Sequence, residues 1–190
     1  MNKNTKIIIA IVAIIAVIGI VVAVVMMNQE KNDGNVEGGN AESKLSINTA
    51  DDMIKLVDDM YKGIEIFPSI ETAEIDVNDK DMFTSVTGLE SSEKIDKVVV
   101  SQPMMSSQAY SLVLVKVKDA NDANAIAKEM NEKANPNKWI CVSAERVYST
   151  SVNNLVFFVM SDADVADPVY NNFKKLAGKI GQEYERVYEE

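Results

Sequence analysis

The 190-residue chain contains no histidine and a single cysteine, Cys141. The missing histidine excludes Ser-His-Asp and Cys-His catalysis, together with the zinc sites that use histidine ligands. One cysteine forms neither an internal disulfide nor a cysteine-based metal cluster. Any chemistry would have to come from carboxylates, lysine, serine or tyrosine, and we expect no cofactor and no enzymatic activity.

Cationic side chains are also scarce. The sequence has 19 Lys and Arg residues against 29 Asp and Glu residues, which gives a formal net charge of −10. A surface of this sign repels nucleic acids and anionic lipid head groups. Nucleic acid is therefore not an expected partner.

The segment from Ile7 to Met27 has no charged, amide or hydroxyl side chain. At a rise of about 1.5 Å per residue, a helix over this segment spans roughly 31 Å, close to the ~30 Å hydrocarbon core of a bilayer. Lys3 and Lys6 precede the segment, and the positive-inside rule then places the N-terminus in the cytoplasm. We expect a single-pass signal-anchor in the lipid bilayer of the cell membrane, with the C-terminal domain extracytoplasmic.

Two other ways of reaching the envelope fit less well. A cleaved signal peptide has an apolar core of only ~7–15 residues and a small-residue cleavage site, and this segment has neither. A lipoprotein needs a cysteine directly after the apolar segment, where this chain has none. The expected organisation is a cytoplasmic N-terminus at 1–6, an anchor at 7–27, a flexible polar linker at 28–45 and one domain at 46–190.

The hydrophobic pattern of the remaining chain predicts an α+β domain. A helix begins after Thr49, which has Asp52 three residues on, and stops near Gly63. Further helices are expected after Asn78 or Asp79 up to Gly88, after Asp119 or Asn121 up to Asn135, and from Asp167 and Pro168 to Val187. Strands are expected at 98–101, 109–118, 139–148 and 154–161, with an edge strand near 73–77.

The expected architecture is a mostly antiparallel sheet of about four strands packed by helices. Val98–Ala134 and Ile140–Ala177 share the order strand, strand, helix, which indicates a possible ββα-ββα pseudo-repeat with both helices on one face. The strands at 109–118 and 154–161 are apolar on both sides, so the second face also needs a cover. The helix at 50–62 is the expected cover; a partner protein or a second copy is the alternative.

Candidate contact residues lie in and near a predicted hairpin connection. Pro103, Met104 and Met105 form an adaptable contact patch, or the methionines fold back and close the end of the core. Trp139 either stacks on a sugar or peptide or packs in the core. Cys141 is expected as a small buried hydrophobe.

Two acidic segments have the first ligands of a calcium loop but lack the later ones. Asp119 and Asp162 each begin such a segment, but the position of the bidentate acid is occupied by Met130 or Phe173. Both segments are better explained as helix caps, and we expect no metal site.

Four blocks, Val98–Tyr110, Leu112–Lys118, Lys138–Cys141 and Val159–Ser161, resemble a family of extracytoplasmic proteins of low-GC Gram-positive, clostridial-type bacteria. The family is known as a domain of unknown function, and its members are membrane-anchored or lipoprotein-like. The resemblance covers about residues 50–188. It implies a location at the cell envelope and no known activity.

These observations favour a non-enzymatic protein-interaction module at the cell envelope, whose partner is another envelope protein. A domain that binds or carries a small ligand or peptide is the alternative. A hydrolase that works without histidine is a third and weaker possibility.

Overall fold

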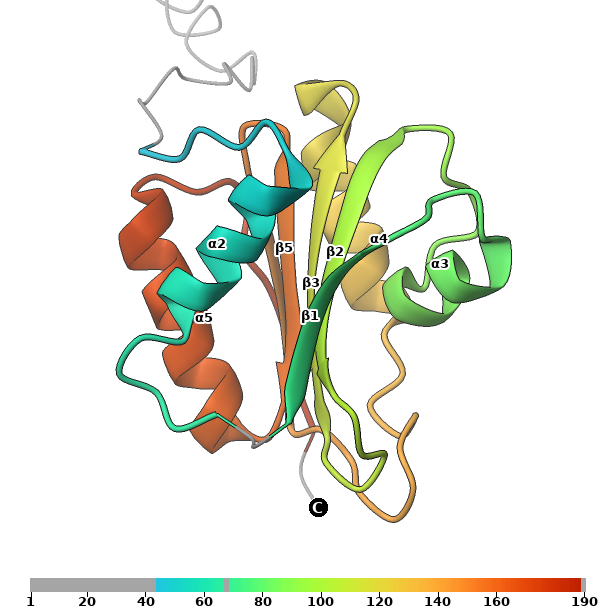
Figure 1. The fold of residues 1–190 in the computed structure, drawn as a ribbon, viewed down its shortest axis with the longest axis vertical. Coiled ribbons are helices and arrows are strands. Elements are labelled where there is room, and N and C mark those ends of the chain that lie inside the picture. Colours follow the sequence, from blue (N-terminus) through green and yellow to red (C-terminus); the bar gives the residue numbers. More distant parts are fainter. Residues whose placement is uncertain (1–43, 67–68, 189–190) are drawn as a thin grey trace, which may run out of the picture. The chain divides into compact units, whose positions relative to one another are not determined.

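An antiparallel sheet with helices on both faces forms the domain in the computed structural model, which describes residues 44–66 and 69–188 (Figure 1). The six strands lie in the order β1-β2-β3-β5-β4-β6. The strands are β1 (Ile70–Ile75), β2 (Ile95–Pro103), β3 (Tyr110–Val117), β4 (Arg146–Val152), β5 (Leu155–Ser161) and β6 (Tyr184–Val187). The helices are α2 (Ala50–Met60), α3 (Lys80–Thr87), the 3-10 turn η1 (Ala120–Asp122), α4 (Ala123–Lys133) and α5 (Ala163–Ala177).

The predicted start signals of the first two helices are confirmed. Thr49 caps α2 in a capping box with Asp52: its hydroxyl accepts from the Asp52 amide, and the Asp52 carboxylate accepts from the Thr49 amide. Asp79 caps α3 by accepting from the Met82 amide, and Gly88 ends that helix at φ 74°. These helices begin and end where local backbone chemistry places them.

The two centre strands, β3 and β5, separate two apolar cores. The prediction that both faces of the sheet are covered is therefore confirmed. On one face α2 and α5 pack against Leu112, Leu114 and Phe157. On the other face α3 and α4 pack against Val113 and Val115. Consecutive residues of β3 point to opposite faces, so its alternating leucines and valines supply both cores.

The predicted pseudo-repeat is wrong in its geometry. The order strand, strand, helix does occur twice, as β2-β3-α4 and β4-β5-α5, and the two hairpins meet through the β3–β5 pair. However, α4 and α5 lie on opposite faces of the sheet, so a twofold axis that keeps both on one face does not relate the units. The helix α2 shares its face with α5, and the sheet gains β1 and β6 at its edges to reach six strands.

The segment predicted as one strand at 139–148 is a strand only from Arg146 onward. The preceding residues form an irregular connection in which Cys141 has a positive φ of 61°. The β4–β5 hairpin then turns at Asn153, whose φ of 52° suits the tight two-residue turn between paired Val152 and Leu155.

The last helix begins and ends earlier than predicted. It starts after Asp162, so that Pro168 lies inside α5 and leaves the Asp164 carbonyl without its helical donor. It ends at Ala177, and Gly178 follows at φ 80°. The apolar residues beyond this point, assigned to the helix by their spacing, belong instead to a connection and to β6.

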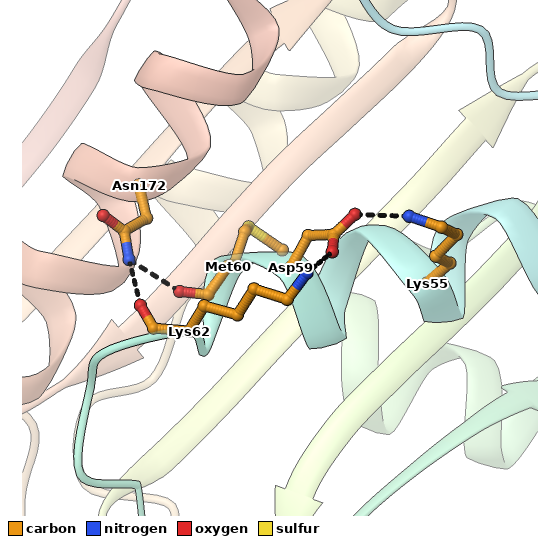
Figure 2. A network of polar contacts seen from close by, with 5 residues as sticks. All are labelled: Lys55, Asp59, Met60, Lys62 and Asn172. Atoms are coloured by element: carbon orange, nitrogen blue, oxygen red, sulfur yellow. Dashed lines mark hydrogen bonds and ion pairs between the residues drawn. The ribbon is translucent and has the colours of Figure 1, made fainter.

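Polar contacts of two side chains fix the ends of two helices. Asn172 of α5 donates to the carbonyl of Met60 (2.9 Å), the last residue of α2, and to that of Lys62 (3.3 Å) just beyond it, while Asp59 accepts from Lys55 and Lys62 (Figure 2). On the other face, the guanidinium of Arg186 in β6 donates to three carbonyl oxygens at the end of α4. These belong to Asn131, Glu132 and Ala134. A cation there also complements the helix dipole.

A buried hydroxyl network joins α2 to three strands. The Tyr61 hydroxyl donates to Ser101 Oγ at 2.7 Å and lies 2.9 Å from the Tyr110 hydroxyl. Thr72 Oγ1 of β1 lies 2.8 Å from Ser101 Oγ. Burial raises the pKa of Tyr61 to about 12, so its hydroxyl keeps its proton and acts as a donor at neutral pH.

We predict that Tyr61→Phe lowers the free energy of unfolding by about 1–3 kcal/mol, because Ser101 and Tyr110 lose their shared partner inside the core. Tyr188→Phe is the matched control: the Tyr188 hydroxyl is also buried but has no hydrogen-bond partner among the described residues. Because a buried hydroxyl without a partner contributes no stabilising bond, its removal should leave stability unchanged or raise it. Urea unfolding followed by circular dichroism measures both. Equal losses would show that the network contributes nothing specific.

Candidate functional site

Two loops meet at one end of the sheet. The β2–β3 connection at 104–109 and the α4–β4 connection at 134–145 are joined by a hydrogen bond from the Ile140 amide to the Ser106 carbonyl (3.2 Å). The Met104 amide donates to the Ser69 carbonyl (3.1 Å), so the first loop is held on a second side. Both loops lie at the opposite end of the domain from residue 44, at the bottom of Figure 1.

These two loops expose large apolar side chains. Met104 is 73% exposed, Met105 58% and Ile140 66%. Only two other large hydrophobic side chains in the described part of the chain are exposed, Met82 at 46% and Val187 at 49%. We call Met104, Met105 and Ile140 the apolar tip. Clusters of this kind mark interaction sites more often than scattered single residues do.

The four predicted contact residues take different places. Met104 and Met105 are exposed, so the alternative in which they close the end of the core is wrong. Pro103 is half-buried as the last residue of β2. Trp139 is half-buried against the core of the α3–α4 face, with the Lys138 ammonium 5.1 Å from its ring centre, so it packs in the core as much as it faces solvent.

Ile140 was missed by sequence reasoning because the predicted strand at 139–148 assigned it to the core. The expectation that Cys141 is a buried hydrophobe is wrong for the same reason: the cysteine is exposed. The available signal was the Asn-Pro-Asn triplet at 135–137, which favours a turn and an irregular connection over an early strand.

A cavity of about 490 Å³ lies beside the tip. Its lining comprises Pro136, Asn137, Cys141, Val142, Ser143, Ala144, Glu145, Asp162 and Tyr188. Several of its polar groups are already paired: Ser143 Oγ donates to Asn137 Oδ1 (2.7 Å), and Glu145 Oε2 accepts from the Ala163 amide (3.0 Å). The space suits a small ligand, but its walls are mainly polar, whereas carrier pockets are mostly apolar.

A lysine and a serine lie together behind the tip. Lys138 Nζ donates to Ser111 Oγ at 3.1 Å, and loss of hydration lowers the pKa of Lys138 to about 8. The pair has the composition of a Ser-Lys dyad. Ser111, however, is completely buried within β3, so no substrate reaches its hydroxyl in this arrangement.

A cluster of tyrosines and carboxylates lies on the face of the sheet that α2 and α5 cover. The rings of Tyr148 and Tyr170 stack 4.6 Å apart, and their hydroxyls donate to Asp167 and Glu183. Burial raises the pKa of both phenols, so they remain donors. Lys174 lies 4.4 Å from the Tyr170 ring centre and pairs with Glu183. The cluster pairs each phenol with a carboxylate, and the contact between Tyr148 of β4 and Asp167 fastens α5 to the sheet.

The acidic segments act at helix starts, as predicted for Asp119, which accepts from the Asn121 amide at 2.9 Å and caps η1. Asp162 stands at the N-cap of α5 without a side-chain capping bond, and the Glu145 carboxylate binds the first amide instead. Within residues 44–66 and 69–188, no group of three or more Asp, Glu or Cys side chains is placed to hold a metal.

No protein-family model, curated protein or solved structure matches the chain. The resemblance to clostridial-type envelope proteins stays a prediction. Across the described ranges, no helix is both long and apolar enough to span a membrane. The predicted anchor at Ile7–Met27 and nearly all of the predicted linker lie outside those ranges.

We predict that the low pKa of Lys138 makes stability depend on alkaline pH. Below pH 8 both the folded and the unfolded chain carry the proton, and the folded state holds a poorly hydrated ammonium. Between about 8 and the ordinary value of 10.5 only the unfolded chain keeps the proton, so the free energy of unfolding rises with pH. Because the Lys138 side chain as a whole is exposed, solvent screening reduces the effect, and we expect the free energy of unfolding to rise by about 1 kcal/mol.

Denaturant unfolding at several pH values between 7 and 10.5 tests this prediction. Lys138→Met should remove the rise, whereas Lys179→Met, which replaces an exposed lysine between α5 and β6, should keep it. An unchanged slope in Lys138→Met would contradict the assignment.

Proposed function

We propose that the chain is a membrane-anchored module at the cell envelope that holds another envelope protein through its apolar tip. The observation that carries this proposal is the joint exposure of Met104, Met105 and Ile140 on two loops fastened to each other. The anchor, the location and the partner are inferred from the sequence, and the tip supplies a surface for the contact.

The tip has the chemistry of a protein contact. Burying one large apolar side chain contributes about 1.5–3 kcal/mol, and three adjacent ones supply a small hot spot. Methionine side chains are flexible and polarizable, so they adapt to an apolar partner surface. The main-chain bonds at Met104 and Ser106 hold the loops before binding, which reduces the entropy lost on association.

Charge argues against the other macromolecular partners. The chain has a net charge of −10 and a calculated isoelectric point near 4.6. Nucleic acid and anionic bilayer surfaces attract proteins of the opposite sign. An apolar patch on an acidic domain is better matched by a protein with a complementary apolar surface.

The position of the tip fits an anchored module. The described chain begins at the end of the domain that lies furthest from the tip (Figure 1). A flexible chain as long as the linker predicted at 28–45 would have a root-mean-square reach of roughly 21–25 Å. Such a reach would bring the domain within contact of a neighbouring envelope protein.

The carrier function is the second candidate, and the cavity beside the tip favours it. It requires a ligand that displaces the existing bonds of Ser143 and Asn137 or uses their remaining capacity. Substitution of Ser143 by Leu would place an apolar side chain in this cavity, remove its hydrogen bond to Asn137 and leave the tip intact, so the same variant separates the two candidates.

We predict that polar substitutions in the apolar tip weaken binding of the partner. A photo-crosslinking residue placed at position 105 of the full-length anchored protein should give a discrete crosslinked product in membranes of the native host. Met104→Ser combined with Ile140→Ser should reduce this product at least tenfold, because both changes remove exposed apolar surface. Both residues are exposed, so the fold should tolerate them, and circular dichroism checks this.

The matched control uses Met82 on α3, the other exposed methionine among the residues that the structure describes. A crosslinker at position 82 should not give the same product, and Met82→Ser should leave the product at position 105 unchanged. A product from position 105 that survives the double substitution, or that equals the background of the anchor alone, would rule out the tip as the contact site. If Ser143→Leu abolished the crosslinked product at position 105 although the tip is unchanged, the carrier function would be favoured.

A further inference from the structure

The described methionines are either buried or exposed. Met53, Met60 and Met130 are completely buried, Met160 is 2% exposed, and Met82 on α3 is 46% exposed. Met104 and Met105 are 73% and 58% exposed, side by side on one loop. A thioether reacts with dissolved oxidants only where solvent reaches its sulfur, so exposure sets the order of reaction.

The loop presents these two thioethers in a fixed place. Its backbone is bonded to the turn at Ser69 through Met104 and to the second loop through Ser106. The two methionines also make up two of the three members of the apolar tip. A change in their polarity would therefore occur within the surface that we assign to partner binding.

We infer that Met104 and Met105 form an oxidation site, at which hydroperoxides convert the thioethers to sulfoxides and so release the partner from the apolar tip. The oxidation itself stands on exposure alone, whereas the release rests on the proposed function.

The chemistry needs no metal and no cofactor. A lone pair of the methionine Sδ attacks one oxygen of hydrogen peroxide, the O–O bond breaks, and an S–O bond forms. The departing hydroxide takes the proton from the oxygen that is now bonded to sulfur, which leaves the sulfoxide and one molecule of water. The sulfur loses two electrons and the peroxide gains them, so atoms and electrons balance.

The sulfoxide turns a flexible apolar side chain into a polar one. A sulfoxide oxygen buried at an apolar contact without a donor loses its hydration and gains no compensating bond. Two such changes in adjacent residues should weaken partner binding at least tenfold. Replacement of both methionines by leucine keeps the apolar surface and removes the oxidisable sulfur.

Cys141 must be separated from this effect, because its thiol is exposed and also reacts with peroxide. It lines the neighbouring cavity. The test therefore uses Cys141→Ser in every variant. Met82, exposed at 46% on α3, serves as the oxidisable residue outside the tip.

The first measurement concerns the site alone. The full-length Cys141→Ser protein in membranes is treated with hydrogen peroxide for increasing times, then quenched, digested and analysed by mass spectrometry. Met104 and Met105 should gain oxygen at least tenfold faster than Met53, Met60, Met130 and Met160. Similar rates for the buried methionines and for the tip would overturn the oxidation site.

The second measurement concerns release, and needs a crosslinker outside the two methionines. With a photo-crosslinker at position 140 of the same protein, peroxide should reduce the crosslinked product at least tenfold. Met104→Leu with Met105→Leu should keep the product under the same treatment, whereas Met82→Leu should give no protection. Product that is lost equally with and without the leucines, or retained in both, would overturn the release.

The two proposals fail in different ways. If no specific product forms even before peroxide, the proposed function fails and the release fails with it, while the order of oxidation is still decided by mass spectrometry. If the product forms and depends on the tip but does not respond to peroxide, only the release fails.

Discussion

The whole domain depends on two strands that are apolar on both sides. In β3 and β5 nearly every side chain is buried, and alternate residues supply two separate cores. Because neither face tolerates water, each needs its own helices, and the chain supplies α2 and α5 to one face and α3 and α4 to the other. The flanking strands are then shorter or more polar, and the outermost strand β6 is held by the contacts of Arg186 with the end of α4.

Because α2, α3, α4 and α5 all cover the faces of the sheet, the ends of the strands are covered only by loops. At the end with the apolar tip, the half-buried Trp139 packs against one core within the long α4–β4 connection, whereas Ile140, the next residue, is exposed. The bond from Ile140 to Ser106 then places it beside the methionines of the neighbouring loop. The exposed apolar surface is thus a consequence of how the connection is anchored, and its position is fixed by main-chain bonds.

The helix caps and the central strands could be predicted from the sequence. The face of the sheet that each helix covers and the length of the last helix could not. The caps at Thr49 and Asp79 and the strands at 109–118 and 154–161 depend on neighbouring residues, and the structure has them close to where the pattern predicts. The face that a helix covers depends on loop geometry, so the positions of α4 and α5 on opposite faces could not be derived. Beyond Gly178, residues at helical spacing lie in a strand because pairing with β4 competes with the helix.

The candidate site shows the same division. Met104 and Met105 are contact candidates because they lie in a predicted hairpin connection, but the sequence leaves open whether they are exposed or close the end of the core. Ile140 was not found, because an isoleucine next to a tryptophan is normally core, and only the late start of β4 places it in solvent. Ile140 adds a rigid β-branched side chain, on a second loop bonded to the first, to the two flexible methionines, and a surface of this kind is better preorganised for a contact than methionines on one loop alone. Because two of its three side chains are thioethers and the third is not, oxidation would change the polarity of the site without changing its backbone.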